Sequence, residues 1–133
     1  MSELEVLPAC EDYRLGAIPW SPLSGGLLAG VLEKIEKGRR ASDHMKKEIE
    51  EKRDKLEKWK TFCKDKDKPP AVVTLAWVMN NPVVTAPIIG PRTMKHLTGA
   101  LKTLRIRFKK DELKQIDEIW HGPGSEALEA YAW

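Results

Sequence analysis

The chain has 133 residues, of which 41% are hydrophobic and 32% charged, and its 23 basic and 20 acidic side chains leave a net charge of +3. A chain of this length is typical of one domain that buries roughly two thirds of its unfolded surface. The two kinds of charge are intermixed, which disfavours a nucleic-acid-binding protein, because such proteins gather basic residues on one face. No apolar run approaches the ~20 residues of a membrane span, and the first residues do not resemble a signal peptide.

The two cysteines, Cys10 and Cys63, have neither the spacing of a metal site nor that of a disulfide framework. Unpaired cysteines are typical of proteins in a reducing compartment. We therefore expect a cytoplasmic protein without a metal site, a membrane partner or a nucleic-acid partner.

The N-terminal residues predict a helix. Leu4, Leu7 and Cys10 fall on one helical stripe between residues 4 and 13. Pro8 fits this helix only in its first turn or at a kink, because proline lacks the N–H group that the helix interior needs.

A short strand and a glycine-rich loop follow. The apolar run Ala17–Trp20 predicts the strand, and Pro19 confines it to a sheet edge or to an irregular ladder. The loop SPLSGGLLAG, residues 21–30, matches neither a P-loop nor a dinucleotide fingerprint. Its glycines would nevertheless let backbone N–H groups approach a ligand closely.

The most charged part of the chain predicts one long amphipathic helix from about Ser42 to about Asp65. Ser42 or Asp43 could cap it, and pairs such as Glu48–Lys52 support it at i,i+4 spacing. Acidic residues interleave with the lysines, which favours a solvated scaffold helix over an RNA-binding or membrane-binding one. The apolar face of this helix consists of Met45, Ile49, Leu56, Trp59 and Cys63.

Beyond Pro69-Pro70 the pattern is helix, strand and helix. Proline is favourable at a helix start, so a helix is expected over Ala71–Asn80, with Val73, Ala76, Trp77 and Met79 available for burial. The β-branched run Val84–Ile89 predicts a second strand, and Leu97 and Leu101 share one face of the helix that follows it.

The turn between that strand and its helix is a candidate anion site. Gly90-Pro91-Arg92-Thr93 places a guanidinium beside a helix N-terminus, where unpaired N–H groups and the helix dipole also favour a negative charge. The alternative interpretation is that Gly90-Pro91 only turns the chain and that Arg92 is a solvated surface residue.

The C-terminal part predicts a last helix over Lys110–Trp120, with Leu113, Ile116 and Ile119 or Trp120 on one side. The tail from His121 to Trp133 has no clear periodicity. Strands that alternate with helices imply parallel pairing through right-handed crossovers. Two parallel strands do not make a complete α/β sheet.

Three segments carry a resemblance to a known family: AIPWSPLSGGLLAG (17–30), TLAWVMNNPVVTAPIIGPRT (74–93) and GPGSEALEAYAW (122–133). They resemble the C-terminal part of an aldo-keto reductase, and the resemblance runs along essentially the whole chain. Members of that family are (β/α)8 barrels of a little over twice this length. The resemblance implies an α/β fold, a partial TIM barrel with two parallel strands and a majority of helical residues, in which Ala17–Trp20 matches the seventh strand and Val84–Ile89 the eighth.

The same resemblance implies part of an NADP(H) site, because the loops after the last two barrel strands commonly hold phosphate. Ser21, Leu23 and Gly25 match the positions that line the pyrophosphate, and Trp20 the aromatic residue that stacks on the nicotinamide. The turn that holds the adenosine 2′-phosphate is matched by Gly90, Arg92 and Thr93, with His96 in the following helix. His96 and Ala100 stand where the family usually has Gln and often Asn, so the resemblance does not extend to adenine recognition. From the sequence alone, Trp20 could equally be a core residue and His96 a surface residue.

No catalytic residue is carried over. The family uses an aspartate, a tyrosine acid, a lysine that lowers the pKa of the tyrosine, and a histidine, all in the first half of the barrel. Tyr13 and Tyr131 match no such motif, and His44, His96 and His121 are out of place. We expect that the chain alone does not reduce a carbonyl group.

Three hypotheses follow. The first is a truncated reductase of aldehydes and ketones that keeps part of the NADP(H) site. The second is a half-enzyme that is active only with an N-terminal half-barrel partner. The third is a non-catalytic oligomerisation or binding module whose open strand edges self-associate.

We expect a single segment over residues 1–133. Within it, residues 1–30 hold the first helix, strand and loop, and residues 31–69 the charged helical insertion. Residues 70–120 hold the remaining helices and strand, and residues 121–133 the tail.

Overall fold

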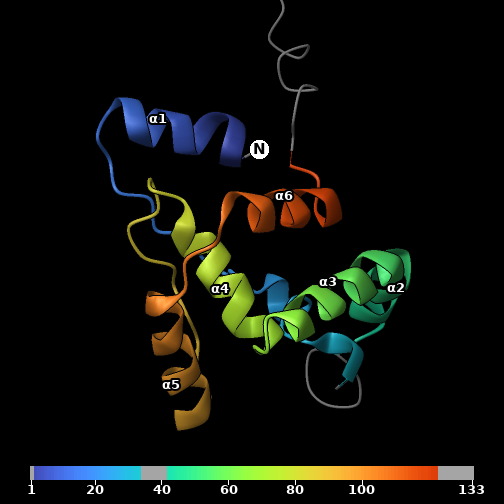
Figure 1. Cartoon of the computed structure of the whole chain (residues 1–133). Helices are drawn as coiled ribbons and strands as arrows, with labels where there is room; N and C mark the ends of the chain where they lie inside the picture. Colours follow the sequence, from blue (N-terminus) through green and yellow to red (C-terminus); the bar gives the residue numbers. More distant parts are fainter. Residues whose placement is uncertain (1, 34–41, 123–133) are drawn as a thin grey trace, which may run out of the picture.

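The computed structural model describes residues 2–33 and 42–122, and it is mostly helical (Figure 1). The long elements are α2 (Asp43–Glu51), α3 (Arg53–Asp65), α4 (Pro70–Asn80), α5 (Met94–Lys102) and α6 (Lys110–Ile119). The short ones are η1 (Ser2–Val6), α1 (Leu7–Asp12), η2 (Ser24–Gly26), η3 (Val31–Glu33) and η5 (Thr103–Arg105). The tail residues 123–133 lie outside the described residues.

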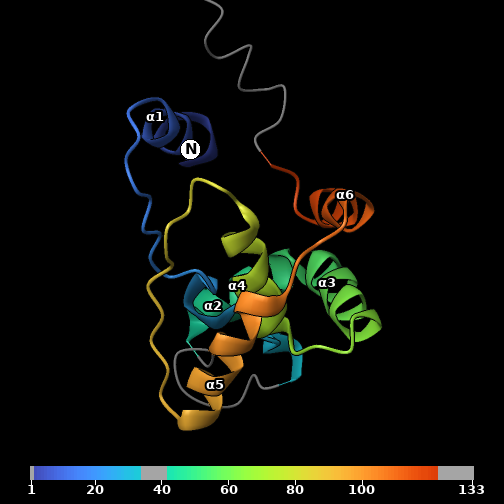
Figure 2. The ribbon, with the colours of Figure 1, turned by 60° about the vertical axis from the view of Figure 1, so that its left-hand side comes forward.

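Helix α4 lies at the centre, with α3, α5 and α6 around it (Figures 1 and 2). Five successive residues of this helix are buried, Val72, Val73, Thr74, Leu75 and Ala76. A helix that is buried on all sides is apolar all round rather than amphipathic. Pro70 stands in its first turn, as the sequence predicts.

The core consists of two adjoining clusters. One contains Leu27, Val31, Met45, Ile49 and Leu56, and the other contains Trp59, Phe62, Cys63, Val73 and Ile116. The five residues predicted for the apolar face of the charged helix are therefore all buried. The charged insertion supplies a large part of the core, and its scaffold role is the one that the amphipathic pattern predicts.

The prediction of a single long helix over residues 42–65 is wrong in one respect, because the helix breaks at Lys52. This residue has φ −111° and ψ 13°, outside the helical region. Hydrogen bonds from the Lys52 N–H to the Glu48 carbonyl and from the Leu56 N–H to the Lys52 carbonyl remain. The break is therefore a kink, and the Ser42 side chain caps α2 by accepting from the Met45 N–H at 3.3 Å.

The two expected strands are not regular strands, which corrects that part of the predicted fold. Residues 17–20 and 84–88 meet only through two isolated parallel bridges, Ala17 with Val84 and Trp20 with Ile88. The direction of the pairing is parallel, as the order of strands and helices implies. The two segments run side by side at the edge of the molecule (Figure 2).

Proline explains why the ladder is incomplete. The Ala17 carbonyl accepts from the Thr85 N–H at 2.9 Å, and the Pro19 carbonyl accepts from the Ile88 N–H at 2.8 Å. The acceptors are two residues apart and the donors three, so the second segment carries one extra residue at the level of Pro87, as in a β-bulge. Neither Pro19 nor Pro87 has an N–H to add to the ladder.

Two polar side chains connect the surrounding segments to α4. The buried Thr74 hydroxyl lies 3.0 Å from the Leu28 carbonyl oxygen and 2.9 Å from that of Pro70, and it donates to them. The Asn80 side chain donates to the Ala76 carbonyl at 2.7 Å and accepts from the Phe108 N–H at 3.4 Å. These contacts fix the glycine-rich loop at one end of α4 and the approach to α6 at the other.

The N-terminal helix is less deeply packed. Leu4, Leu7 and Cys10 are half-buried, as the predicted stripe requires, and Pro8 lies in the first turn of α1. In α5, by contrast, no residue is buried, and Leu101 is 56% exposed although its spacing with Leu97 predicts an apolar face. Within residues 2–33 and 42–122 there is no helix with the length and apolar character needed to span a membrane.

An ion pair joins the end of α3 to the start of α6. The Lys66 ammonium contacts the Glu112 carboxylate, which also accepts from the Lys109 backbone N–H at 2.8 Å. The hydrogen bond from Lys66, with a smaller contribution from Lys109, lowers the pKa of Glu112 below its ordinary value. The charged carboxylate is therefore favoured in the folded state.

We predict that Glu112→Gln lowers the free energy of unfolding by about 0.5–1 kcal/mol at neutral pH, the range of partly exposed ion pairs. Glutamine still accepts from Lys109 but carries no charge. Because the folded-state pKa is lowered, the stabilisation is present above the ordinary glutamate pKa of about 4.3 and is lost as the pH falls through the folded-state value. Urea denaturation between neutral pH and about pH 3 should show the two proteins converging in acid.

The matched control is Glu118→Gln, an exposed carboxylate on the same helix. It should leave stability unchanged at every pH. A difference between wild type and Glu112→Gln that stays constant down to the lowest pH would contradict the ion-pair interpretation.

Candidate functional site

The two loops predicted to hold a cofactor leave the paired segments at the same end. The bridge between Trp20 and Ile88 is the last contact of the parallel pair. The glycine-rich loop begins directly after Trp20, and the turn that leads into α5 begins directly after Ile88. In α/β proteins the ligand sites lie at the carboxyl ends of parallel strands, where loops from neighbouring strands come together in this way.

The loop at residues 21–30 is a series of tight turns with left-handed residues. Ser21, Ser24 and Gly25 have φ values of 54°, 47° and 65°. The Gly25 N–H donates to the Ser21 hydroxyl oxygen at 3.3 Å, so this predicted phosphate donor is engaged within the loop. The Leu23 N–H has no hydrogen-bond partner among the described residues. Of the three predicted pyrophosphate residues, Leu23 thus offers an open backbone donor, while Ser21 and Gly25 shape the loop.

Helix α5 begins at a well-formed N-cap. The Thr93 hydroxyl oxygen accepts from the His96 N–H at 3.2 Å, which satisfies one of the donors left unpaired at a helix start. The N–H groups of Met94 and Lys95 have no partner among the described residues. These two donors point out of the first turn of a helix, where an anion is favoured.

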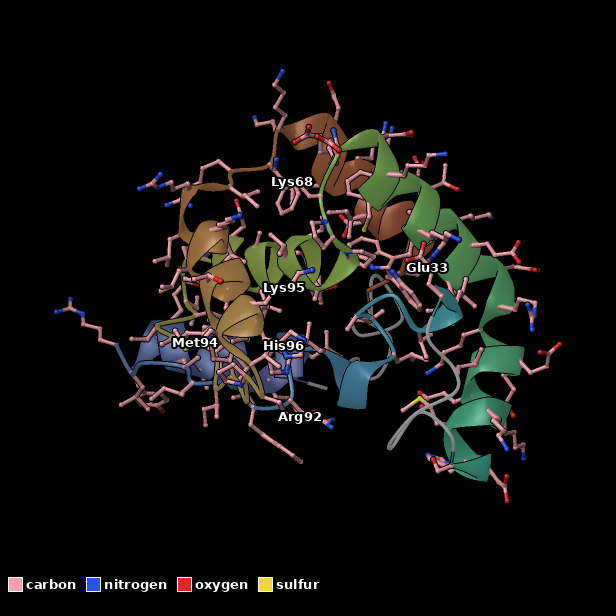
Figure 3. The ribbon with its side chains drawn as sticks, turned by 90° about the horizontal axis from the view of Figure 1, so that it is seen from below. Glu33, Lys68, Arg92, Met94, Lys95 and His96 are labelled. Atoms are coloured by element: carbon pink, nitrogen blue, oxygen red, sulfur yellow. The ribbon has the colours of Figure 1, made fainter. Side chains whose placement is uncertain are left out.

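The charged side chains of this turn are exposed. Arg92, Lys95 and His96 lie together at the end where α5 begins (Figure 3). Arg92 forms no ion pair with any residue in the described part of the chain. Sequence reasoning missed Lys95, although a second cation in the first turn of the predicted helix was a readable signal. Gly90 precedes this group in open surroundings, since an added Cβ would meet no atom within 4 Å.

Trp20 is a surface residue. Its side chain is 79% exposed, so the alternative that it belongs to the core is wrong. An exposed indole beside two loops with open donors is a flat apolar surface on which a planar ring could stack. The two loops share no hydrogen bond with one another in the described residues, so the structure brings them to one end of the molecule without linking them.

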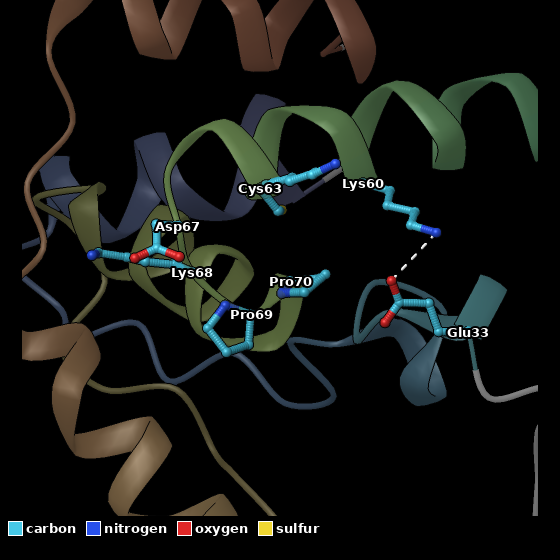
Figure 4. Close-up of a pocket in the computed structure, with 8 residues that line it drawn as sticks. Glu33, Lys60, Cys63, Asp67, Lys68, Pro69 and Pro70 are labelled. Carbon is cyan, nitrogen blue, oxygen red and sulfur yellow. Dashed lines mark ion pairs between the residues drawn. The ribbon is translucent and has the colours of Figure 1, made fainter.

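A cavity of the described residues lies elsewhere. It has a volume of about 350 Å³ and is lined by Glu33, Lys60, Cys63, Lys64, Asp67, Lys68, Pro69 and Pro70 (Figure 4). Glu33 and Lys60 form an ion pair of 3.3 Å at its rim. Burial raises the pKa of the Cys63 thiol to about 12, which makes it a poor nucleophile. None of the predicted cofactor residues lines this cavity.

Other chemistry finds little support in the described residues. No group of three or more histidine, cysteine, aspartate or glutamate side chains is arranged to hold a metal ion there, and both cysteines are free. Tyr13 is 73% exposed at the end of α1, and Tyr131 lies outside the described residues. The predicted cofactor residues remain a prediction, with the α5 N-terminus as their best-formed part.

Comparison with known proteins gives consistent matches. The profile of the Aldo/keto reductase family matches residues 1–121. The chain is 47% identical over 132 residues, 99% of its length, to the "Uncharacterized oxidoreductase YrpG" of Bacillus subtilis. It is 31% identical over 123 residues to "Aldo-keto reductase NECHADRAFT_45914" of Fusarium vanettenii, and 28% identical over 118 residues to "Norsolorinic acid reductase A" of Aspergillus parasiticus. These matches cover 89% and 87% of this chain. The chain spans 40%, 33% and 29% of the lengths of these three relatives.

We predict that Gly25→Ala destabilises the protein by about 1–2 kcal/mol, because its φ of 65° is costly for a residue with a Cβ. The Cβ itself would meet only the Met45 methyl group at 3.5 Å, so strain in the backbone rather than a clash causes the loss. Urea denaturation measures the change.

Gly90→Ala is the matched control, since Gly90 lies in open space and its φ is not in the left-handed region. It should change stability by less than about 0.5 kcal/mol. Equal losses of stability in the two variants would contradict backbone strain at Gly25 as the cause.

Proposed function

The chain belongs to the aldo/keto reductase family, and from that premise we propose that it carries the phosphate-binding end of an NADP(H) site in an oxidoreductase of aldehydes and ketones. Members of this family are (β/α)8 barrels that generally use NADP(H). In the proposed assignment, residues 17–20 and 84–88 are the last two barrel strands, and α6 covers one side of the barrel.

The observation that carries the proposal is the parallel pairing of the two segments. The bridges Ala17–Val84 and Trp20–Ile88 bring two loops, separated by more than sixty positions in the chain, to a common end. Parallel neighbours in this order, with both loops at their carboxyl ends, are the arrangement from which barrel proteins build a phosphate site.

The residues of this end suit the cofactor. Arg92 supplies a planar guanidinium that is free to bind a phosphate in bidentate fashion. The first-turn N–H groups of Met94 and Lys95 add donors, and the exposed indole of Trp20 adds an apolar surface for a pyridine ring. We assign Gly90, Arg92 and Thr93 to the adenosine 2′-phosphate, with His96 next to them. Ser21, Leu23 and Gly25 are assigned to the pyrophosphate.

The bound cofactor would supply the hydride for carbonyl reduction. The residues of this chain would bind and orient it, with Trp20 fixing the plane of the nicotinamide and Arg92 selecting for the 2′-phosphate. We propose that the proton-donating groups lie outside these 133 residues, in further parts of a longer polypeptide or in a partner chain. The chain alone is then inactive, and its substrate is set by those other parts.

Calorimetric titration of the purified chain with NADPH and NADH tests the proposal. We expect NADPH to bind more tightly than NADH, because only NADPH carries the 2′-phosphate. Arg92→Ala should weaken NADPH binding by about tenfold or more, as expected for loss of hydrogen bonds to a charged group. It should leave NADH binding nearly unchanged, so that the preference between the cofactors disappears.

The matched control is Arg105→Ala, which removes another exposed guanidinium, beyond the opposite end of α5. It should leave both affinities unchanged, apart from a small effect of net charge at low salt. The proposal would be contradicted if neither cofactor bound at millimolar concentration. It would also be contradicted if the two arginine variants lost the same amount of NADPH affinity.

A further inference from the structure

The charges of the chain are unevenly distributed around the candidate phosphate turn. Residues 68–110 contain no aspartate or glutamate, although the whole chain has 20 such residues. The same stretch has eight basic residues, which are Lys68, Arg92, Lys95, Lys102, Arg105, Arg107, Lys109 and Lys110. Positive charge therefore collects on and beside α5, even though the two kinds of charge are intermixed in the rest of the chain.

Three of these cations, Lys95, Lys102 and Arg105, form a basic stripe along α5 and η5. Lys95 and Lys102 are two helical turns apart, and Arg105 follows one turn later, so the three side chains lie on one side. All three are exposed, and none forms an ion pair with a residue in the described part of the chain. The basic stripe begins next to Arg92 and extends for roughly 15 Å, at about 1.5 Å per residue.

The elements against which α5 packs do not neutralise the basic stripe. Helix α5 packs against α4 and continues into η5. Helix α4 has no charged residue, and the charged residue of η5 is Arg105 itself. Because no carboxylate of these elements cancels it, the positive field extends into solvent over about a Debye length, which is ~10 Å at 0.1 M salt.

The stability of the helix does not account for the basic stripe. A cation is favourable at a helix C-terminus and unfavourable at a helix N-terminus, because of the helix dipole. Lys102 suits the last turn of α5, but Lys95 stands in the first turn, which has no acidic residue. Lys95 therefore opposes the helix dipole together with Arg92, and a bound anion would offset this unfavourable charge.

We propose that the basic stripe steers the anionic cofactor toward the turn at residues 90–93 and so raises its rate of association. The proposal rests on the cofactor assignment made above. NADPH carries a pyrophosphate and a 2′-phosphate, and a surface of one sign of charge raises the encounter rate of an oppositely charged ligand. Lys102 acts at a distance, because about 10 Å of helix separates it from Lys95. A phosphate on the turn is therefore beyond its hydrogen-bonding reach.

The basic stripe is compatible with the proposed barrel. Helix α5 follows the second paired segment, so it belongs to the outer ring of helices, whose polar side faces solvent. Charges farther away than a Debye length are largely screened at ordinary ionic strength. Loss of Lys102 or Arg105 should therefore change the association rate at low salt and have little effect on a titration at ordinary salt.

Stopped-flow measurement of NADPH association with the full chain, at about 0.05 M salt, tests the proposal. Lys102→Glu should lower the association rate constant by about threefold or more and leave the dissociation rate constant nearly unchanged. The effect should fade as salt is raised toward 1 M, where the Debye length falls to about 3 Å. It should be smaller for NADH, which lacks the 2′-phosphate.

The matched control is Lys114→Glu, which makes the same change of charge at an exposed position of α6. Helix α4 separates α6 from α5 (Figures 1 and 2), so this variant should have little effect on association. Lys102→Gln removes the charge without reversing it and should give an intermediate rate. It also keeps the test decisive if Lys102→Glu disturbs the end of α5.

The outcomes separate the basic stripe from the cofactor assignment. If NADPH binds but Lys102→Glu and Lys114→Glu slow association equally, the steering is overturned and the cofactor assignment stands. The same holds if Lys102→Glu changes only the dissociation rate constant. If NADPH does not bind at all, both the cofactor assignment and the steering fail.

Discussion

The burial of α4 on every side is the constraint on which the rest of the structure depends. Its residues Val72, Val73, Leu75 and Ala76 are within a tenth of complete burial, so other elements must cover each face of the helix. Helix α3 covers one face, and α5 with η5 covers another. Thr74 is the only polar member of this buried run, and it binds the Leu28 carbonyl. The helix therefore holds the glycine-rich loop that follows the segment at residues 17–20. The chain that leaves the C-terminus of α4 leads directly into the second paired segment, residues 84–88.

Helices and core faces were predictable because apolar spacing and proline position are local signals. Apolar residues recur at helical spacing between Met45 and Cys63, and each of the predicted core positions in that run is buried. The kink at Lys52 was not predictable, since the apolar period runs through it unbroken and Leu56 beyond it joins the same cluster as Met45 and Ile49. The strands were overestimated for a related reason. Their β-branched content is a local property, whereas a regular ladder needs N–H groups that Pro19 and Pro87 do not have.

The candidate site was predictable only in part. The turn at Gly90 to Thr93 and its helix follow from the sequence, including the cap that Thr93 provides. The glycine-rich loop was harder to interpret, because glycine content does not reveal which amides are used internally. Gly25 donates within the loop and Leu23 does not, a difference that depends on the left-handed φ values of Ser21 and Ser24. The exposure of Trp20 likewise depends on which elements surround it, and a single residue type cannot encode that.

The reactivity of the buried Cys63 thiol reports how often the core opens. The thiol lies among Trp59, Val73 and Ile116, where α3, α4 and α6 meet, and with a pKa raised to about 12 it remains protonated under ordinary conditions. Because Cys63 is 1% exposed, a thiol reagent can modify it only when the residues around it move apart, and the rate of modification counts such openings. Half-buried Cys10 on α1 reports local fluctuations of the N-terminal helix by the same chemistry. The two thiols therefore report separately on the opening of the core and on the opening of the N-terminal helix.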